Sequence, residues 1–336
     1  MLVFRRGRSA PRPDTSTWQS PRIAAAPRQV SGSGSTAPFR ALAGSGRVLG
    51  VAFSPDGRRV VAGFGGVAGR SPSARVPRIT VFDAETGTQL HQLTISGTGD
   101  AVFSQDATRA LVDAGFSIGL YDTETGQQLL RFSPGLVHGV AFLPGRTQAL
   151  VGDYELKLWD LASETGGIRI ATLRKDGEQG ENDARRVAVS SDGKWAASLA
   201  TESFRGWDLR ARRELWRLAG CRGNQMSVAF SPDGTHVVQG CPGEIRVIHT
   251  ETGKRVAAWT GFKGNVLGLA FSPNGQYVLS GDSDDERVAR LWEFGTGRLV
   301  ERYPVTYEWT AAVAFSPDGR RLLAGAMDEV RIWEMR

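Results

Sequence analysis

The sequence is poor in the residues that cross-link a chain or anchor it in a membrane. It has only two cysteines, Cys221 and Cys241, in 336 residues, which excludes a dense disulfide framework and a Cys-x-x-Cys zinc motif. It contains no apolar run of about 18 residues, the length that a transmembrane helix needs, and its first residues hold no apolar segment typical of a secretory signal peptide. We therefore expect no membrane association and a reducing, cytoplasmic location.

The sequence also lacks the short motifs of the common enzyme classes. It has no Gly-x-Ser-x-Gly elbow, no phosphate-binding P-loop, no protein-kinase motif and no His-Glu-x-x-His zinc motif. No two of its four histidines, His91, His138, His236 and His249, are spaced as metal ligands. We therefore predict a protein that is not an enzyme and that holds no metal and no cofactor.

An even charge balance over most of the chain argues against a nucleic-acid-binding domain. The net charge is +6, but residues 1–38 hold six arginines against Asp14 alone. This segment is rich in Pro, Ser, Gly and Arg and has too few apolar residues to offset the entropy lost on ordering. We predict that residues 1–38 are a disordered basic tail, and that nucleic acid could be bound only through it.

From residue 39 onward the sequence repeats itself. Strong copies of one unit read VAFSPDGRRVVAG from Val51, VAFSPDGTHVVQG from Val228, LAFSPNGQYVLSG from Leu269 and VAFSPDGRRLLAG from Val313. Weaker copies begin at Ala101, Val140 and Val187. Alternation in VAF predicts a strand, and Ser-Pro-Asp-Gly is turn chemistry because Pro presets φ and Gly adopts φ > 0.

A second unit, again a strand and a turn, follows each copy of the first. Examples are ITVFDAETGTQL from Ile79, LKLWDLASETGG from Leu156 and the terminal VRIWEMR from Val330. Each full repeat therefore predicts four short antiparallel strands, here called a, b, c and d in chain order. One such sheet cannot bury both of its faces, and stacking the sheets around an axis solves this problem.

Ser-Pro-Asp-Gly turns combined with Trp-Asp or Trp-Glu strand ends, at spacings of 39 to 50 residues, resemble the WD-repeat family, whose usual period is about 40–45 residues. The resemblance covers residues 39–336 and implies an all-β fold, a seven-bladed β-propeller with four antiparallel strands per blade. It looks bacterial in style. The Gly-His dipeptide that the family places before strand a is missing from every copy, so we expect its His–Asp–Ser–Trp hydrogen-bond network to be absent or degenerate.

The number of strands predicts how the ring closes. The chain ends directly after strand c of the last blade, so that blade lacks a strand d. Residues 39–44, FRALAG, carry an apolar pair, Phe39 and Leu42, like that of the other d strands. We predict that this segment completes the last blade.

The resemblance places the d–a and b–c loops on one face, called the top face, where partners commonly bind. Trp309 and Arg47 occupy equivalent positions on neighbouring blades there, and Tyr307 lies nearby; aromatic and Arg side chains are frequent interface anchors. Arg185 and His138 are predicted near the mouth of the channel. We predict a monomeric scaffold that binds a protein partner through these residues. The alternatives are an enzyme or small-molecule binder that uses the channel, with His138, Arg185 and Asp183, and a regulatory propeller of a signalling system.

Two further clusters lie in the predicted top loops. The resemblance puts Cys221 where the family has His, and puts Cys241 in the b–c loop of the same blade, so the two thiols are a candidate pair for a disulfide or a soft metal; two unrelated buried residues are the alternative. Asp282, Asp284, Asp285 and Glu286 form an acidic loop, which we expect to be solvated and not a calcium site because the EF-hand pattern is absent.

Overall fold

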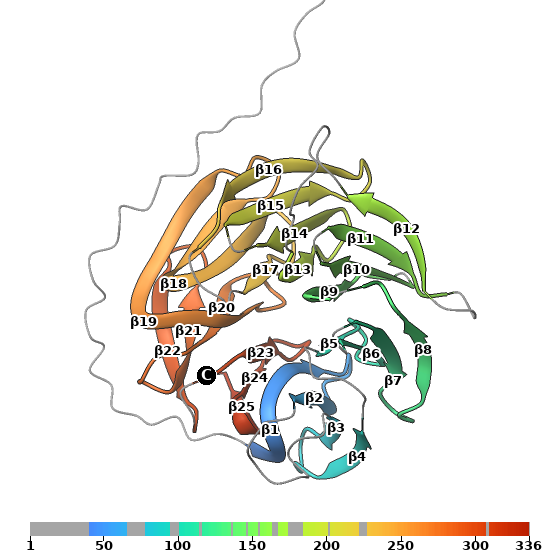
Figure 1. Ribbon diagram of the computed structural model, residues 1–336. Coiled ribbons are helices and arrows are strands. Elements are labelled where there is room, and N and C mark those ends of the chain that lie inside the picture. Colours follow the sequence, from blue (N-terminus) through green and yellow to red (C-terminus); the bar gives the residue numbers. More distant parts are fainter. Residues whose placement is uncertain are drawn as a thin grey trace, which may run out of the picture.

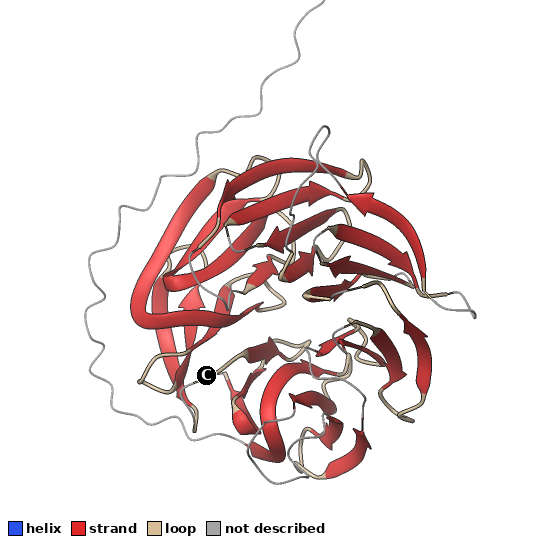
Figure 2. Cartoon of the chain, viewed as in Figure 1, coloured by secondary structure: helices blue, strands red, loops and turns tan. Residues whose placement is uncertain are grey.

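The structure is a computed structural model. It describes residues 40–65, 78–94, 101–113, 116–135, 137–145, 147–153, 155–162, 167–173, 184–200, 202–221, 227–306 and 309–335. The predicted tail, residues 1–38, lies outside these residues, as do Phe39, Asp183 and Tyr307. Within the described ranges every regular element is a β-strand (Figure 2).

The strands are short and follow one another through tight turns. In chain order they are β1 (Arg40–Phe53), β2 (Arg59–Gly65), β3 (Arg78–Asp83), β4 (Gln89–Thr94), β5 (Ala101–Phe103), β6 (Arg109–Asp113), β7 (Ile118–Asp122), β8 (Gln128–Phe132), β9 (Gly139–Phe142), β10 (Gln148–Gly152), β11 (Leu156–Asp160), β12 (Ile168–Leu173), β13 (Arg186–Val189), β14 (Trp195–Leu199), β15 (Ser203–Asp208), β16 (Arg213–Ala219), β17 (Val228–Phe230), β18 (His236–His249), β19 (Arg255–Phe271), β20 (Tyr277–Asp282), β21 (Val288–Glu293), β22 (Arg298–Pro304), β23 (Ala312–Phe315), β24 (Arg321–Gly325) and β25 (Met327–Glu334).

The strands form antiparallel sheets that resolve into four-stranded blades. Three sheets have four strands each and form the second, third and fourth blades: β5 to β8, β9 to β12 and β13 to β16. Two larger sheets arise because β1 and β19 each belong to two blades. The first half of β1 is strand d of the last blade and its second half is strand a of the first blade. In the same way, β19 is strand d of the fifth blade and strand a of the sixth. In the six-stranded sheet, β18 supplies both strand b and strand c of its blade.

The blades are arranged around a central axis. Figure 1 shows β5, β9, β13, β17 and β23 near the centre, and β8, β12 and β16 at the periphery. Seven clusters of buried apolar side chains lie between successive blades, since each sheet buries its two faces against its neighbours. The all-β propeller prediction is confirmed, and this arrangement fits the predicted seven blades.

The ring closes through the predicted N-terminal strand. The first half of β1 pairs antiparallel with β25, with Arg40 opposite Ile332 and Leu42 opposite Val330. Leu42 is completely buried in the cluster between the last and first blades. The chain segments that close the ring are thus about 290 residues apart in sequence and share one sheet, so we expect closure to stabilise the whole ring.

The Ser-Pro-Asp-Gly turns are held by a repeated set of hydrogen bonds. The Ser54 hydroxyl donates to the Asp56 carboxylate at 2.6 Å and accepts the backbone N–H of Arg59 at 2.9 Å. This Ser–Asp bond lowers the pKa of Asp56, with help from the backbone N–H of Arg58. The same pattern recurs at Ser104, Ser190, Ser231, Ser272 and Ser316, with Asn274 in place of Asp after Ser272.

The predicted weakening of the family's hydrogen-bond network is confirmed. Trp207 and Trp292 each donate their indole N–H to a serine of strand b, Ser198 and Ser280, at 2.9 Å. In the described part of the chain the buried indole N–H groups of Trp159 and Trp333 have no such acceptor, because Val151 and Ala324 stand at the serine position. The Trp–Ser hydrogen bond of the network is therefore present in these two blades and absent from the two blades of Trp159 and Trp333.

Candidate functional site

The inner strands surround a central channel that is open in two places. Toward the top face, a cavity of about 270 Å³ is lined by the inner strands of several blades and by Arg186. Toward the opposite face, a larger cavity of about 1210 Å³ is lined by residues that include Phe53, Phe142 and Pro232. The upper cavity is thus the smaller of the two and has a cation in its lining, whereas the lower cavity is larger and is lined by both apolar and polar side chains.

Trp309 and Arg47 meet at the top face, where the last blade adjoins the first. Trp309 follows β22 and keeps 48% of its surface exposed. The guanidinium of Arg47, on β1, lies over the Trp309 ring at 5.4 Å from its centroid, a cation–π arrangement. The two residues that the sequence placed on neighbouring blades are therefore in contact. We call this pair the Trp309 surface.

Arg186 brings a second cation to the same mouth of the channel. It is the first residue of β13 and lines the upper cavity. Burial lowers the pKa of Arg186, and the positive charge of Arg47 lowers it further. The two like charges, which lie on different blades, therefore act on each other unfavourably.

The other predicted mouth residues lie at the boundary between the third and fourth blades. His138 directly precedes β9, and its backbone N–H donates to the Gly152 carbonyl at 2.9 Å. Gly139, the next residue, comes so close to the fourth blade that an added Cβ would lie 3.0 Å from the Arg185 carbonyl oxygen. His138 and Arg185 therefore each directly precede an inner strand, β9 and β13, of two neighbouring blades. Tyr307 and Asp183 lie outside the described residues.

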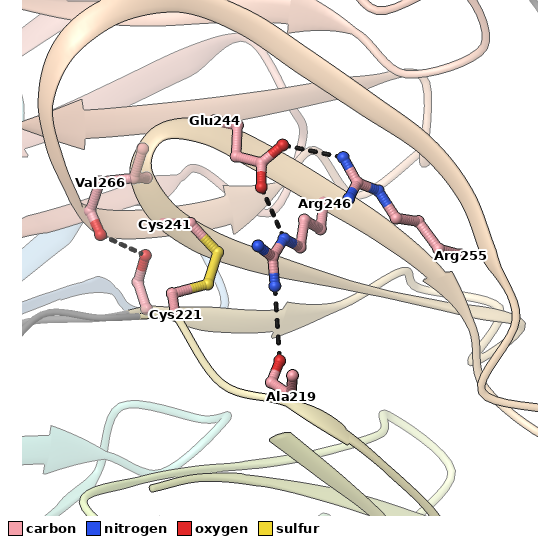
Figure 3. The surroundings of a disulfide bond; sticks show 8 residues. Ala219, Cys221, Cys241, Glu244, Arg246, Arg255 and Val266 are labelled. Carbon is pink, nitrogen blue, oxygen red and sulfur yellow. Dashed lines mark hydrogen bonds and ion pairs between the residues drawn. A yellow bond between two sulfur atoms is a disulfide. The ribbon is translucent and has the colours of Figure 1, made fainter. Parts of the chain in front are cut away.

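The two cysteines are joined in a disulfide in the fifth blade (Figure 3). Cys221 lies before β17 and Cys241 within β18, their Cα atoms are 5.5 Å apart, and both are buried. Beside them Glu244 accepts hydrogen bonds from Arg246 at 2.6 Å and Arg255 at 2.8 Å. The bond links the d–a and b–c connections, the two segments that the family's missing His would join. Disulfides persist mainly in oxidising compartments, which is at odds with the predicted reducing location.

The acidic loop of the sixth blade is not the solvated segment that we expected. Asp282 and Asp284 are buried and form ion pairs with Arg290, which is completely buried on β21. The expectation is wrong for these two residues because a buried guanidinium requires counter-charges, and the loop folds inward to supply them. Burial raises the pKa of Asp282 to about 6, although the charge of Arg290 opposes this shift.

Two histidines that are distant in sequence come together in the fifth blade. The rings of His236 and His249 are in edge-to-face contact, with centroids 5.8 Å apart, and Phe294 packs against His236.

Among the described residues no group of three or more His, Cys, Asp or Glu could hold a metal ion. The described residues also form no helix that is long and apolar enough to cross a membrane.

Sequence reasoning missed Arg186 and Arg290. Arg186 stands three residues before the apolar residue that ends its inner strand, where five of the other blades have Gly, Ser or Ala. An arginine at a position where five other repeats have a small residue, and one has Asp100, could have indicated a special place in the channel. Arg290 gave no such indication, because its burial depends on how the loop before it folds.

Comparison with known proteins agrees with this architecture. A family model described as "WD domain, G-beta repeat" matches residues 37–68 and 253–293. The β-propeller domain of Cps50 (Swd1) from Myceliophteria thermophila is similar in structure, with a TM-score of 0.73 and 16% sequence identity over 90% of this chain and 100% of that one. No curated protein is significantly similar in sequence. With its repeated Ser-Pro-Asp-Gly turns and closed ring of blades, the chain has a β-propeller fold, and two of its segments match the WD-repeat model.

Proposed function

We propose that the protein is a monomeric interaction scaffold that binds a protein partner at the Trp309 surface and performs no catalysis of its own. WD-repeat propellers are commonly scaffolds of this kind. The observation that carries the proposal is the half-exposed Trp309 ring stacked on Arg47. Tryptophan and arginine supply a large share of binding energy at protein interfaces. Since the stacked arginine is already partly ordered, it loses less entropy when a partner binds.

The position of the pair also supports a binding role. Trp309 lies in a loop on the rigid scaffold of blades, and exposed loops on rigid scaffolds carry function more often than the framework does. A tryptophan that served only to pack the last blade would be buried, as Trp333 and Trp292 are.

Affinity capture from host lysate with the full chain tests the proposal. We expect Trp309→Ala to reduce capture of the partner at least tenfold, a typical effect of losing an interface anchor. The matched control is Leu129→Ala, which removes another exposed apolar side chain, 43% exposed, from β8 on the outer edge of the second blade. Equal capture by the two variants, with equal thermal stability, would contradict a scaffold that uses the Trp309 surface.

A further inference from the structure

Five blades carry a cation at the same position of strand c, and each of these cations is paired with a carboxylate. The position lies two residues before the place that Trp occupies in four blades. A cation that is partly removed from water requires such a counter-charge. The pairs are Lys157–Asp153, Arg205–Glu214, Arg246–Glu244, Arg290–Asp282 and Arg331–Glu329.

The second blade departs from this pattern. Gly119 stands at the position of the cation, and a Cβ on it would lie 2.5 Å from the Tyr121 ring, which leaves no room for a side chain. A cation comes instead from the neighbouring strand, where Arg131 of β8 lies directly opposite Gly119. Its Nε and Nη2 atoms donate to the hydroxyl of the buried Ser117, at 3.3 and 3.1 Å. Arg131 is exposed, and no carboxylate of the described residues forms an ion pair with it.

The residue before Ser117 is the most exposed large apolar side chain in the described part of the chain. Phe116 keeps 71% of its surface exposed, against 48% for Trp309. It lies in the b–c connection between β6 and β7, on the same top face as the loop of Trp309. An aromatic ring in water gains free energy when it is covered, and an exposed guanidinium without a carboxylate gains from a charge-assisted hydrogen bond.

We propose that Phe116 and Arg131 form a second anchor for the protein partner, here called the Phe116 surface. It binds a segment that places a large apolar side chain on the Phe116 ring and a neighbouring carboxylate on the Arg131 guanidinium. This inference rests on the proposed function, because it gives the partner a second contact and specifies its chemistry. A partner that binds both the Trp309 surface and the Phe116 surface spans the first blade.

The two groups contribute differently to recognition. The Phe116 ring supplies apolar contact area, and aromatic side chains are frequent interface anchors. The guanidinium has five N–H donors, of which Ser117 receives two. The remaining donors can bind the two oxygens of a carboxylate, the group whose planar geometry the guanidinium matches. Because an exposed ion pair alone adds little affinity, we expect the ring to provide most of the affinity and Arg131 to select an acidic segment.

Peptide selection on the full chain tests this surface without knowledge of the partner. The probe is a phage library of random dodecapeptides. Peptides that bind wild type but not Phe116→Ser are synthesised with a fluorescein label and titrated by fluorescence anisotropy. We expect them to carry Asp or Glu within two residues of a large apolar residue, and to bind Arg131→Gln at least tenfold more weakly. Arg131→Glu should also bind them poorly, and should recover binding when the acidic residue of the peptide is replaced by Lys.

Two control variants separate this surface from general stickiness. Leu129→Ser removes an exposed apolar side chain from β8 of the same blade. Arg169→Gln removes an exposed arginine from β12 of the third blade. Both variants should bind the selected peptides as wild type does. Phe116 and Arg131 are exposed, so their variants should keep the melting temperature of wild type.

Four results would overturn the proposal. One is a selection that yields no peptide dependent on Phe116. Another is a set of Phe116-dependent peptides that lack acidic residues or bind Arg131→Gln equally well, which would indicate an apolar contact alone. The third is an equal loss on Arg169→Gln, which would indicate general charge attraction. The last is equal capture of the cellular partner by wild type and Phe116→Ser. Failure of the proposed function itself is read separately, from capture by Trp309→Ala.

Discussion

Removal of the Cys221–Cys241 disulfide should destabilise the propeller measurably. The bond closes a loop between residues 20 apart in sequence, and the chain-entropy relation assigns about 3 kcal/mol to a loop of that length. With an unfolding entropy of about 2.1 cal/mol/K per residue over roughly 300 residues, this loss corresponds to a fall of about 5 °C in the melting temperature. Both cysteines are buried, so the native protein should also resist mild reductants.

Single and double alanine variants separate loss of the bond from loss of packing. Cys221→Ala and Cys241→Ala each break the disulfide, so each alone should cost nearly as much as the double variant in urea unfolding followed by circular dichroism. Protein folded under oxidising conditions should have no thiol to alkylate after unfolding without reductant. Two alkylated cysteines, or single variants whose losses add up to that of the double variant, would refute a stabilising disulfide at this place.

Three other changes test closure, the Trp–Ser network and the buried ion cluster. Leu42→Ala removes a completely buried side chain from the closing strand and should lower the free energy of unfolding by about 2–5 kcal/mol; a loss well under about 1 kcal/mol in urea titrations would show that closure contributes little. Ala324→Ser offers the buried indole N–H of Trp333 an acceptor and should raise the free energy of unfolding by about 1 kcal/mol, whereas lower stability would contradict that pairing. The pKa of Asp282 is raised to about 6, so the folded state retains a proton that the unfolded state releases near its ordinary pKa. The stability that Asp282 contributes at low pH is therefore lost as the pH rises through about 6, on the order of 1 kcal/mol between pH 5 and pH 7. The stability difference between wild type and Asp282→Asn should fall by that amount over this range, and a difference independent of pH would show that Arg290 holds Asp282 ionised throughout.

The fold could be predicted from the sequence because each repeat specifies the same local structure. Pro, Asp and Gly fix the a–b turns, and the strand patterns between them recur. The missing last strand d predicted closure by residues 39–44, and the pairing of Leu42 with Val330 agrees. The absence of Gly-His correctly predicted a degenerate network, and the absence of Ser in two blades accounts for the indoles that lack an acceptor.

What the sequence did not predict depends on contacts between blades and on how loops fold. The buried pairing of Arg290 with Asp282 and Asp284 requires the b–c loop to turn inward, and alternation along a strand does not encode that. The repulsion between Arg47 and Arg186 joins residues that are about 140 positions apart and lie on different blades. The sequence selected Trp309 and Arg47 through the repeat register, but their stacking became visible only in three dimensions.

Hydrogen–deuterium exchange of the full chain, alone and with its captured partner, tests the central claim most directly. If the top face binds the partner, amides near Arg47, around Arg186 and in residues 309–312 should exchange more slowly in the complex. The Ser-Pro-Asp-Gly turns on the opposite face, such as that at Ser54–Gly57, should be unaffected. Protection confined to those turns or to the outer strands, with the top face unchanged, would contradict a scaffold that works through Trp309.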